Sequence, residues 1–173
     1  KIDQEGIIIK NGRKIVIKTA DDPFWSVADS VSFIGVCGND LFSLYTPIST
    51  KLIRIYSGDL HCKPDLGTNL LINTSDIESY IAGVVKSEGG SGRHPEYFKT
   101  QAVIARTYMY RHLNRHRLDK FDLCDDVHCQ AFNGIADDSL IIKAAIETKG
   151  MVIIGPDSKP IIAAFHANCG GET

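Results

Sequence analysis

The chain has 173 residues, of which 43% are hydrophobic and 23% are charged, and its formal net charge at pH 7 is -2. A chain of this length is one ordinary domain, or one domain with a small appendage. The near-neutral charge offers no basic field for phosphates, which argues against nucleic acid as the main partner. No apolar run approaches the ~18–20 residues that a bilayer requires, so no membrane span is predicted.

The ends of the chain carry an expectation of their own. The chain begins at Lys1 without an initiator methionine or an apolar leader, and it stops in a glycine turn at 170–173. We expect a mature or truncated form, with an export signal that is not visible in this chain and further residues after its C-terminus.

Residues 1–72 are predicted to form a strand-rich N-terminal region. Asn11 and Gly12 lie between two isoleucine-rich runs, and this dipeptide accepts the positive φ angles of a tight hairpin turn. Further β-rich runs occur at 31–36 and 52–56, with turn-forming residues between them. Short strands with frequent turns are typical of a small antiparallel sheet or barrel-like unit.

Residues 73–173 show helical patterns instead. Residues 75–78 fit a capping box, in which Ser75 and Glu78 bond the free amides at a helix start, and Gly89 and Gly90 follow the helix. A second helix is expected from Pro95 to about residue 115.

A third helix and a hairpin complete this region. Asp138 is expected to cap the helix, which ends near Lys149 before Gly150. A hairpin is then predicted over 152–165. The fold class is therefore predicted to be α+β, a helical core with short antiparallel strands.

Glu88 is the most informative carboxylate in the sequence. It lies at the carbonyl end of the first predicted helix, where the helix dipole disfavours negative charge. A carboxylate there tends to keep its proton, particularly if it is partly buried, and this suits a general acid. The alternative is an exposed surface glutamate before a glycine stop.

Polar side chains interrupt the apolar second helix at Gln101, Arg106 and Tyr108. Such groups need partners, which either a structural network or a polar ligand can supply. Arg106 fits an ordinary ion pair equally well.

Cys124, His128 and Cys129 form a close group of metal-ligand types, and His112 and His116 precede them. One of these two histidines would complete a Cys2His2 zinc site, although the spacing is not that of a standard zinc finger. A Cys124–Cys129 disulfide or two unpaired thiols are the alternatives.

His166 lies at the end of a predicted strand and enters a glycine-rich loop that also contains Cys169. Strand-end loops often face a cleft, so His166 is a candidate ligand-binding residue, and a half-buried structural histidine is the alternative. Cys37 and Cys62 have no partner at a diagnostic spacing, so the five cysteines do not pair simply.

Four ordered motifs resemble the stage II sporulation protein D family, which includes the LytB amidase enhancers. They are IESYIAGVV at 77–85 with Glu88, KTQAVIARTY at 99–108, and the segments 124–130 and 165–173. The resemblance covers roughly residues 70–173. It implies an exported lytic transglycosylase of the cell envelope that acts on peptidoglycan strands whose stem peptides an amidase has removed.

The resemblance also implies roles for individual residues. Glu88 would be the catalytic acid and base. Gln101, Arg106, Tyr108 and His166 would line the sugar cleft. A structural zinc would be held by Cys124, His128, Cys129 and His116, with His112 as the alternative fourth ligand. A cell-wall amidase is an expected partner.

The chain departs from the family pattern directly after Glu88. The family usually has a methionine and then a Trp-Pro segment, whereas this chain has glycines at 89, 90 and 92 and His94 before Pro95. Two other functions are open: a non-catalytic glycan-binding module that stimulates an amidase, and an inverting hydrolase that uses Asp125 or Asp126 as a second carboxylate.

Overall fold

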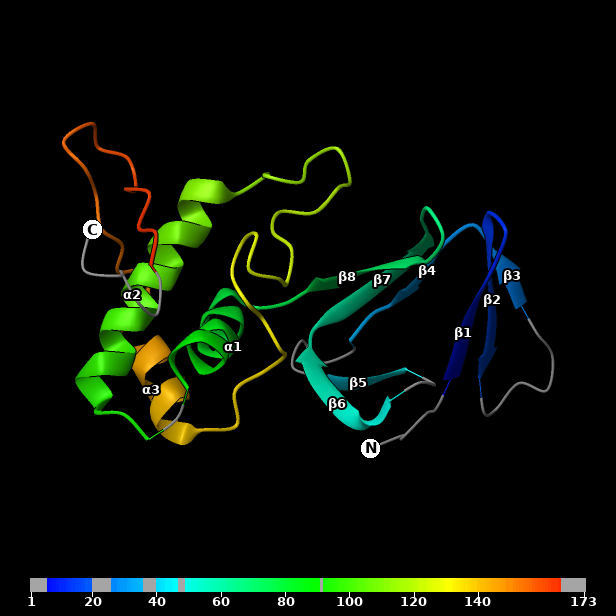
Figure 1. Ribbon diagram of the computed structural model, residues 1–173, viewed down its shortest axis with the longest axis horizontal. Helices are drawn as coiled ribbons and strands as arrows, with labels where there is room; N and C mark the ends of the chain where they lie inside the picture. The colour runs from blue at the N-terminus through cyan, green and yellow to red at the C-terminus, as the bar shows by residue number, and fades with distance from the viewer. Residues whose placement is uncertain (1–5, 20–25, 36–39, 47–48, 91, 166–173) are drawn as a thin grey trace. The chain divides into compact units, whose positions relative to one another are not determined.

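The structure is a computed structural model that describes residues 6–19, 26–35, 40–46, 49–90 and 92–165 (Figure 1). Within these ranges eight strands precede three helices, and the predicted α+β class is confirmed. The chain divides into two compact units. The first comprises Lys1–Phe42 and Tyr56–Ser75, and the second comprises Ser43–Ile55 and Asp76–Thr173.

The first unit is built from short strands. Strands also form the segment Ser43–Ile55, which belongs to the second unit and lies in sequence between the two parts of the first. Strands β1 (Gly6–Asn11), β2 (Lys14–Thr19) and β3 (Ser26–Ala28) form one antiparallel sheet, in that order. Strands β4 (Val31–Phe33), β7 (Asp59–Pro64) and β8 (Asn69–Thr74) form a second antiparallel sheet. Strands β5 (Leu41–Thr46) and β6 (Ser49–Ser57) pair as a two-stranded sheet.

The predicted N-terminal hairpin is present, with its turn one residue later than expected. Asn11 pairs with Lys14, so Gly12 and Arg13 form the two-residue turn, and Gly12 has a φ of 63°. Only the first of these positions requires glycine-like backbone freedom. Cys62 on β7 is fully buried, and burial raises the pKa of its thiol.

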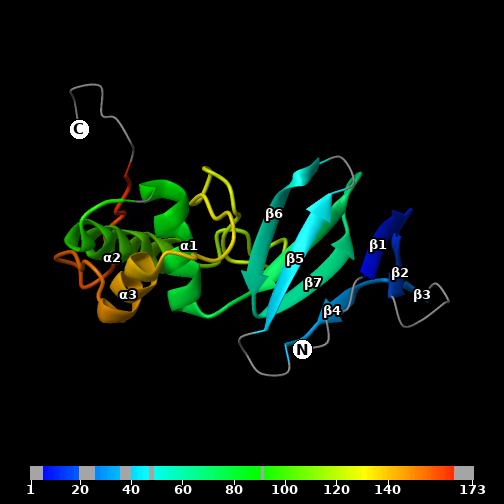
Figure 2. The ribbon, with the colours of Figure 1, turned by 90° about the horizontal axis from the view of Figure 1, so that it is seen from below.

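Three helices form the core of the second unit. Helices α1 (Ile77–Gly89), α2 (Pro95–His112) and α3 (Ser139–Glu147) pack against one another (Figures 1 and 2). Their contacts bury mainly small and apolar side chains, which include Ile81, Val84, Val85, Phe98, Ala102, Ala105, Ile141, Ala144 and Ala145.

Two helices end earlier than the sequence pattern indicates. Helix α2 stops at His112, because Leu113 has extended backbone angles and Asn114 is left-handed with a φ of 64°. Helix α3 stops at Glu147, before the predicted end at Lys149.

The predicted C-terminal hairpin is present without regular strands. Ile154 and Pro160 form a single antiparallel bridge, and Ile161 donates a backbone hydrogen bond to Ile153. Proline has no amide hydrogen, which prevents a longer ladder at this position.

The cap of α1 differs from the predicted capping box. The carboxylate of Asp76, rather than the hydroxyl of Ser75, accepts hydrogen bonds from the amides of Glu78 and Ser79, at 3.0 and 3.1 Å. The Glu78 side chain forms an ion pair with Arg106 instead of bonding back to the cap.

Asp76→Ala is therefore expected to lower the free energy of unfolding by about 1 kcal/mol, because two helix amides lose their acceptor. Urea unfolding followed by circular dichroism measures the change. Ser75→Ala is the matched control and is expected to have a much smaller effect. Equal losses in the two variants would contradict the assignment of Asp76 as the cap.

Candidate functional site

Glu88 lies at the C-terminal end of α1, one residue before the last, and its side chain is exposed. The partial burial considered from the sequence is not observed. Its Oε1 accepts a hydrogen bond of 2.8 Å from the backbone amide of Ala131. The carboxylate is thus oriented by a segment 43 residues further along the chain.

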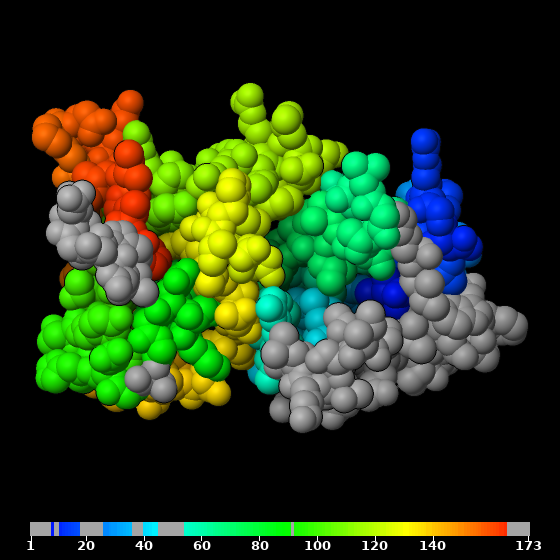
Figure 3. Space-filling view, viewed as in Figure 1, coloured from blue at the N-terminus to red at the C-terminus, as the bar shows by residue number. Residues whose placement is uncertain are grey.

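The segment around Ala131 lies along one face of α1. A Cβ at Gly83 would come within 2.3 Å of the Phe132 ring and 2.4 Å of the Gly134 carbonyl oxygen, so only glycine permits this approach. The amide of Asn133 donates to the Ser87 hydroxyl at 3.0 Å. The segment, yellow in Figures 1 and 3, passes beside α1 and reaches the molecular surface.

Tyr80 and Gln130 join this face of α1 to α2. The Tyr80 hydroxyl donates to Gln130 Oε1 at 3.2 Å, and Gln130 Nε2 donates to the Ala105 carbonyl at 3.3 Å. Burial raises the pKa of Tyr80, and so do the nearby Cys129, Cys124, Tyr108 and Glu88. Tyr80 therefore stays a neutral hydrogen-bond donor to Gln130.

The candidate metal ligands come together immediately before this segment. One ligand atom from each of His116, Cys124, His128 and Cys129 lies within 4.8 Å of all the others. Cys129 Sγ is 3.4 Å from His116 Nε2 and 3.7 Å from His128 Nδ1, and Cys124 Sγ is 3.6 Å from His128 Nδ1. We call these four residues the Cys2His2 cluster.

Three distances between ligand atoms of the Cys2His2 cluster, 3.4, 3.6 and 3.7 Å, fit a four-coordinate metal. Bonds of about 2.0–2.3 Å to nitrogen and sulfur place tetrahedral ligand atoms about 3.3–3.8 Å apart. The two thiols do not form a disulfide with each other. Burial raises the pKa of the Cys129 thiol, and Arg115 counteracts this. The cluster can therefore hold a metal.

The early end of α2 decides which histidine joins the cluster. His116 lies beyond the helix, where its ring stacks on Phe121 with centroids 4.6 Å apart. His112 stacks on Tyr108 instead, and its Nδ1 lies 2.8 Å from the Tyr108 carbonyl oxygen. His116 and His112 are therefore not equivalent positions on one helix, as the sequence suggested.

Tyr108 is linked to the Cys2His2 cluster through Arg115. Arg115 Nη1 donates to the Tyr108 hydroxyl at 2.9 Å, and its Nη2 lies 3.3 Å from His128 Nε2. Tyr108 is half-buried, so part of the residue still faces solvent.

Arg106 does not line a cleft, which corrects its expected role in sugar binding. Its side chain is 0% exposed and forms an ion pair with Glu78. It also donates to the carbonyls of Ala145 and Met151, at 3.0 and 3.3 Å. Arg106 therefore ties α2 to α1 and to the end of α3, which is the structural alternative considered from the sequence.

The other candidate residues lie in different surroundings. Gln101 is half-buried on α2, and His166 lies outside the described residues. Asp125 forms a 3.3 Å ion pair with Arg54, and Asp126 accepts a 2.7 Å hydrogen bond from the Val127 amide. Both aspartates are exposed.

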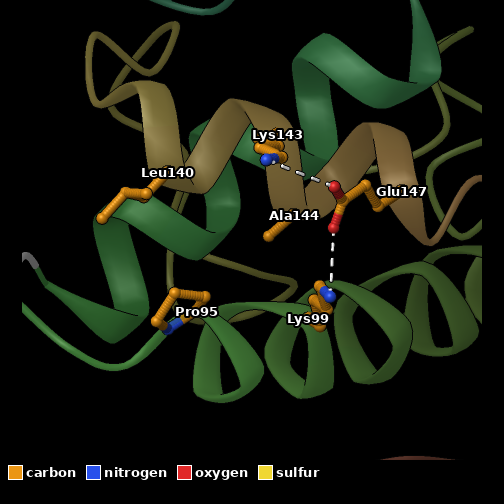
Figure 4. A pocket seen from close by; sticks show the side chains of 6 residues that line it. All are labelled: Pro95, Lys99, Leu140, Lys143, Ala144 and Glu147. Atoms are coloured by element: carbon orange, nitrogen blue, oxygen red, sulfur yellow. Dashed lines mark ion pairs between the residues drawn. The ribbon is translucent and has the colours of Figure 1, made fainter.

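A shallow groove between α2 and α3 contains none of the candidate residues. Pro95, Leu140 and Ala144 line it. Lys99 of α2 pairs with Glu147 across it, and Lys143 pairs with Glu147 along α3, as Figure 4 shows. These ion pairs satisfy its charges internally, so the groove does not compete with the Glu88 region as the functional site.

Sequence reasoning missed the groups that orient Glu88. A backbone amide such as that of Ala131 carries no signal in sequence. Gly83 was the one visible signal, because a glycine in the middle of a helix often marks a close approach of another segment.

The chain is similar to a known protein family and to a known bacterial protein. The family model described as Stage II sporulation protein matches residues 66–154, a range that contains Glu88 and the Cys2His2 cluster. An uncharacterized protein of Brachyspira hyodysenteriae is 32% identical over 120 residues, which are 68% of this chain and 32% of that protein. The chain thus spans about a third of that relative's length. No solved structure matches it.

Proposed function

Because the chain belongs to the Stage II sporulation protein family, we propose that it is a peptidoglycan lytic transglycosylase with Glu88 as its acid and base. The observation that carries the proposal is the exposed Glu88 carboxylate, which the Ala131 amide holds through one oxygen at 2.8 Å. The other oxygen accepts no hydrogen bond from the Ala131 amide, so it is the one we assign to the substrate.

The proposed reaction uses one carboxyl group twice. Glu88 first protonates the glycosidic oxygen between N-acetylmuramic acid and N-acetylglucosamine. The glycosidic bond breaks, and the N-acetylglucosamine oxygen leaves as a hydroxyl group. As a carboxylate Glu88 then takes the proton of the muramoyl 6-hydroxyl, whose oxygen bonds to the anomeric carbon and gives a 1,6-anhydro end. This scheme needs no second carboxylate, unlike most glycosidases. The ion pair between Asp125 and Arg54 is consistent with this scheme, because Asp125 already has a partner.

We further propose that the Cys2His2 cluster binds zinc in a structural role. Four protein ligands leave no open position for a substrate or water, so the ion would brace the loop rather than take part in the reaction. Cys129 is two residues before Ala131, whose amide contacts Glu88. The cluster would therefore fix the segment that orients the catalytic carboxylate.

The product distinguishes the proposed reaction from its rivals. Purified protein is incubated with amidase-treated peptidoglycan, and the new chain ends are identified by mass spectrometry. Anhydromuramoyl ends are expected. Reducing ends would indicate a hydrolase that uses water, and intact chains bound by the protein would indicate a glycan-binding module. Either outcome would overturn the transglycosylase proposal.

Zinc has its own test, which does not depend on activity. Protein purified without chelator is expected to contain about one zinc ion per chain by elemental analysis. Cys124→Ser is expected to lose most of the metal, because one of four ligands is removed. His112→Ala is the matched control and should keep it. Metal-free wild-type protein would reject the site.

The cellular location of the activity, its substrate and its partner are also proposals. None of the helices in the described part of the chain is long and apolar enough to cross a membrane. A role in the cell envelope, with glycan strands as substrate and a cell-wall amidase as the partner that prepares them, follows from the family and from the proposed reaction.

A further inference from the structure

An aromatic ring lies beside the residue that follows Glu88, and the proposed reaction does not use it. Tyr97 is in the first turn of α2 and is 38% exposed. A Cβ at Gly89 would lie 3.3 Å from its Cε1 and 3.6 Å from its hydroxyl oxygen, so the ring rests on Gly89. The ring is therefore an exposed apolar surface next to the end of α1 that carries Glu88.

A positively charged side chain lies near this ring. The guanidinium carbon of Arg93 lies 5.9 Å from the centroid of Tyr97, within the range of a cation–π contact. Arg93 is exposed, and no ion pair found in the described ranges includes it. The nearest acidic residue in sequence, Glu96, pairs with Lys99. Arg93 thus presents a positive charge that no carboxylate of these ion pairs neutralises.

The chemistry of the proposed substrate supplies a matching anion. When an amidase cleaves the bond between the stem peptide and the lactyl group of N-acetylmuramic acid, a neutral amide becomes a carboxylate. Each peptide-free muramoyl residue therefore gains a negative charge close to its sugar ring. Arg is well suited to bind such a group because its planar guanidinium can donate two parallel hydrogen bonds to a carboxylate.

We propose that Arg93 binds the lactyl carboxylate of a peptide-free muramoyl residue while the ring of Tyr97 packs against the apolar face of that sugar. An aromatic surface with one polar anchor is a common way to bind and orient a small ligand. The inference rests on the proposed function, since it assigns the selection of peptide-free strands to this pair at the same site.

Binding measurements test the pair. Isothermal titration calorimetry compares peptide-free glycan chains with the same chains after their lactyl carboxylates are converted to methylamides. The wild-type protein is expected to bind the carboxylate form about tenfold more tightly, as for one charge-assisted contact. Arg93→Gln should reduce the ratio to about one, and Arg93→Lys should restore part of it.

Two further variants separate the contributions. Tyr97→Ala is expected to weaken binding of both chains, because the apolar surface serves each of them. Arg111→Gln, which removes an exposed charge elsewhere on α2, should keep the wild-type preference. An Arg93→Gln protein that still prefers the carboxylate form would overturn the proposal, and so would a Tyr97→Ala protein that binds both chains normally.

The binding test of Arg93 and the product test of the proposed reaction can fail independently of each other. A protein that forms no anhydromuramoyl ends but loses its carboxylate preference on Arg93→Gln would refute the transglycosylase and support the role of Arg93. A protein that forms these ends but shows no preference for either chain would do the reverse.

Discussion

Glu88→Gln is expected to lower the rate of anhydromuramoyl end formation by about 10²–10⁴-fold, the usual contribution of one general acid or base. Glutamine has nearly the same shape as glutamate. Its carbonyl oxygen can still accept the hydrogen bond from the Ala131 amide, so the loop should stay in place. What is lost is the proton that the leaving oxygen needs and the base that accepts the proton of the 6-hydroxyl.

The measurement is the initial rate of product formation on amidase-treated peptidoglycan, with thermal unfolding as a check on the fold. Glu147→Gln is the matched control, since Glu147 is a half-exposed carboxylate on α3 that pairs with two lysines. It should keep the wild-type rate. A Glu88→Gln protein that is folded and forms anhydromuramoyl ends at the wild-type rate would remove Glu88 from the mechanism.

The sequence was sufficient for features that depend on neighbouring residues. The stop of α1 at Gly89 and Gly90, the start of α2 at Pro95 and the cap of α3 at Asp138 all follow from local backbone chemistry. The two cysteines and His128 of the Cys2His2 cluster are also local. They lie within six residues of one another, and a single tight turn brings them together.

Features that depend on distant segments were not predictable. In the sequence, His112 and His116 are equally plausible as the fourth metal ligand. The structure distinguishes them because the chain leaves the helix between them, where Asn114 is left-handed. The contact of Ala131 with Glu88 joins positions 43 residues apart through a backbone amide, which has no residue signature. The partner of Arg106 was equally invisible, because Glu78 had a plausible local role in a capping box.

Arg106→Met is expected to lower the free energy of unfolding by about 3–5 kcal/mol, the cost of breaking a buried ion pair by removing one partner. The variant leaves Glu78, whose side chain is 12% exposed, without its cation. It also deprives the Ala145 and Met151 carbonyls of a donor. Urea unfolding measures the loss, and Arg111→Met, an exposed position on the same helix, is the control with little expected change.

A double variant separates a structural Arg106 from a sugar-binding one. Replacing both Arg106 with Met and Glu78 with Leu removes the unpaired charge, so stability should recover a large part of the loss. The folded double variant should then bind glycan as the wild-type protein does, because neither Arg106 nor Glu78 would touch the substrate. A stable Arg106→Met protein with weakened glycan binding would instead return Arg106 to the sugar cleft and contradict the structural role assigned to its buried ion pair.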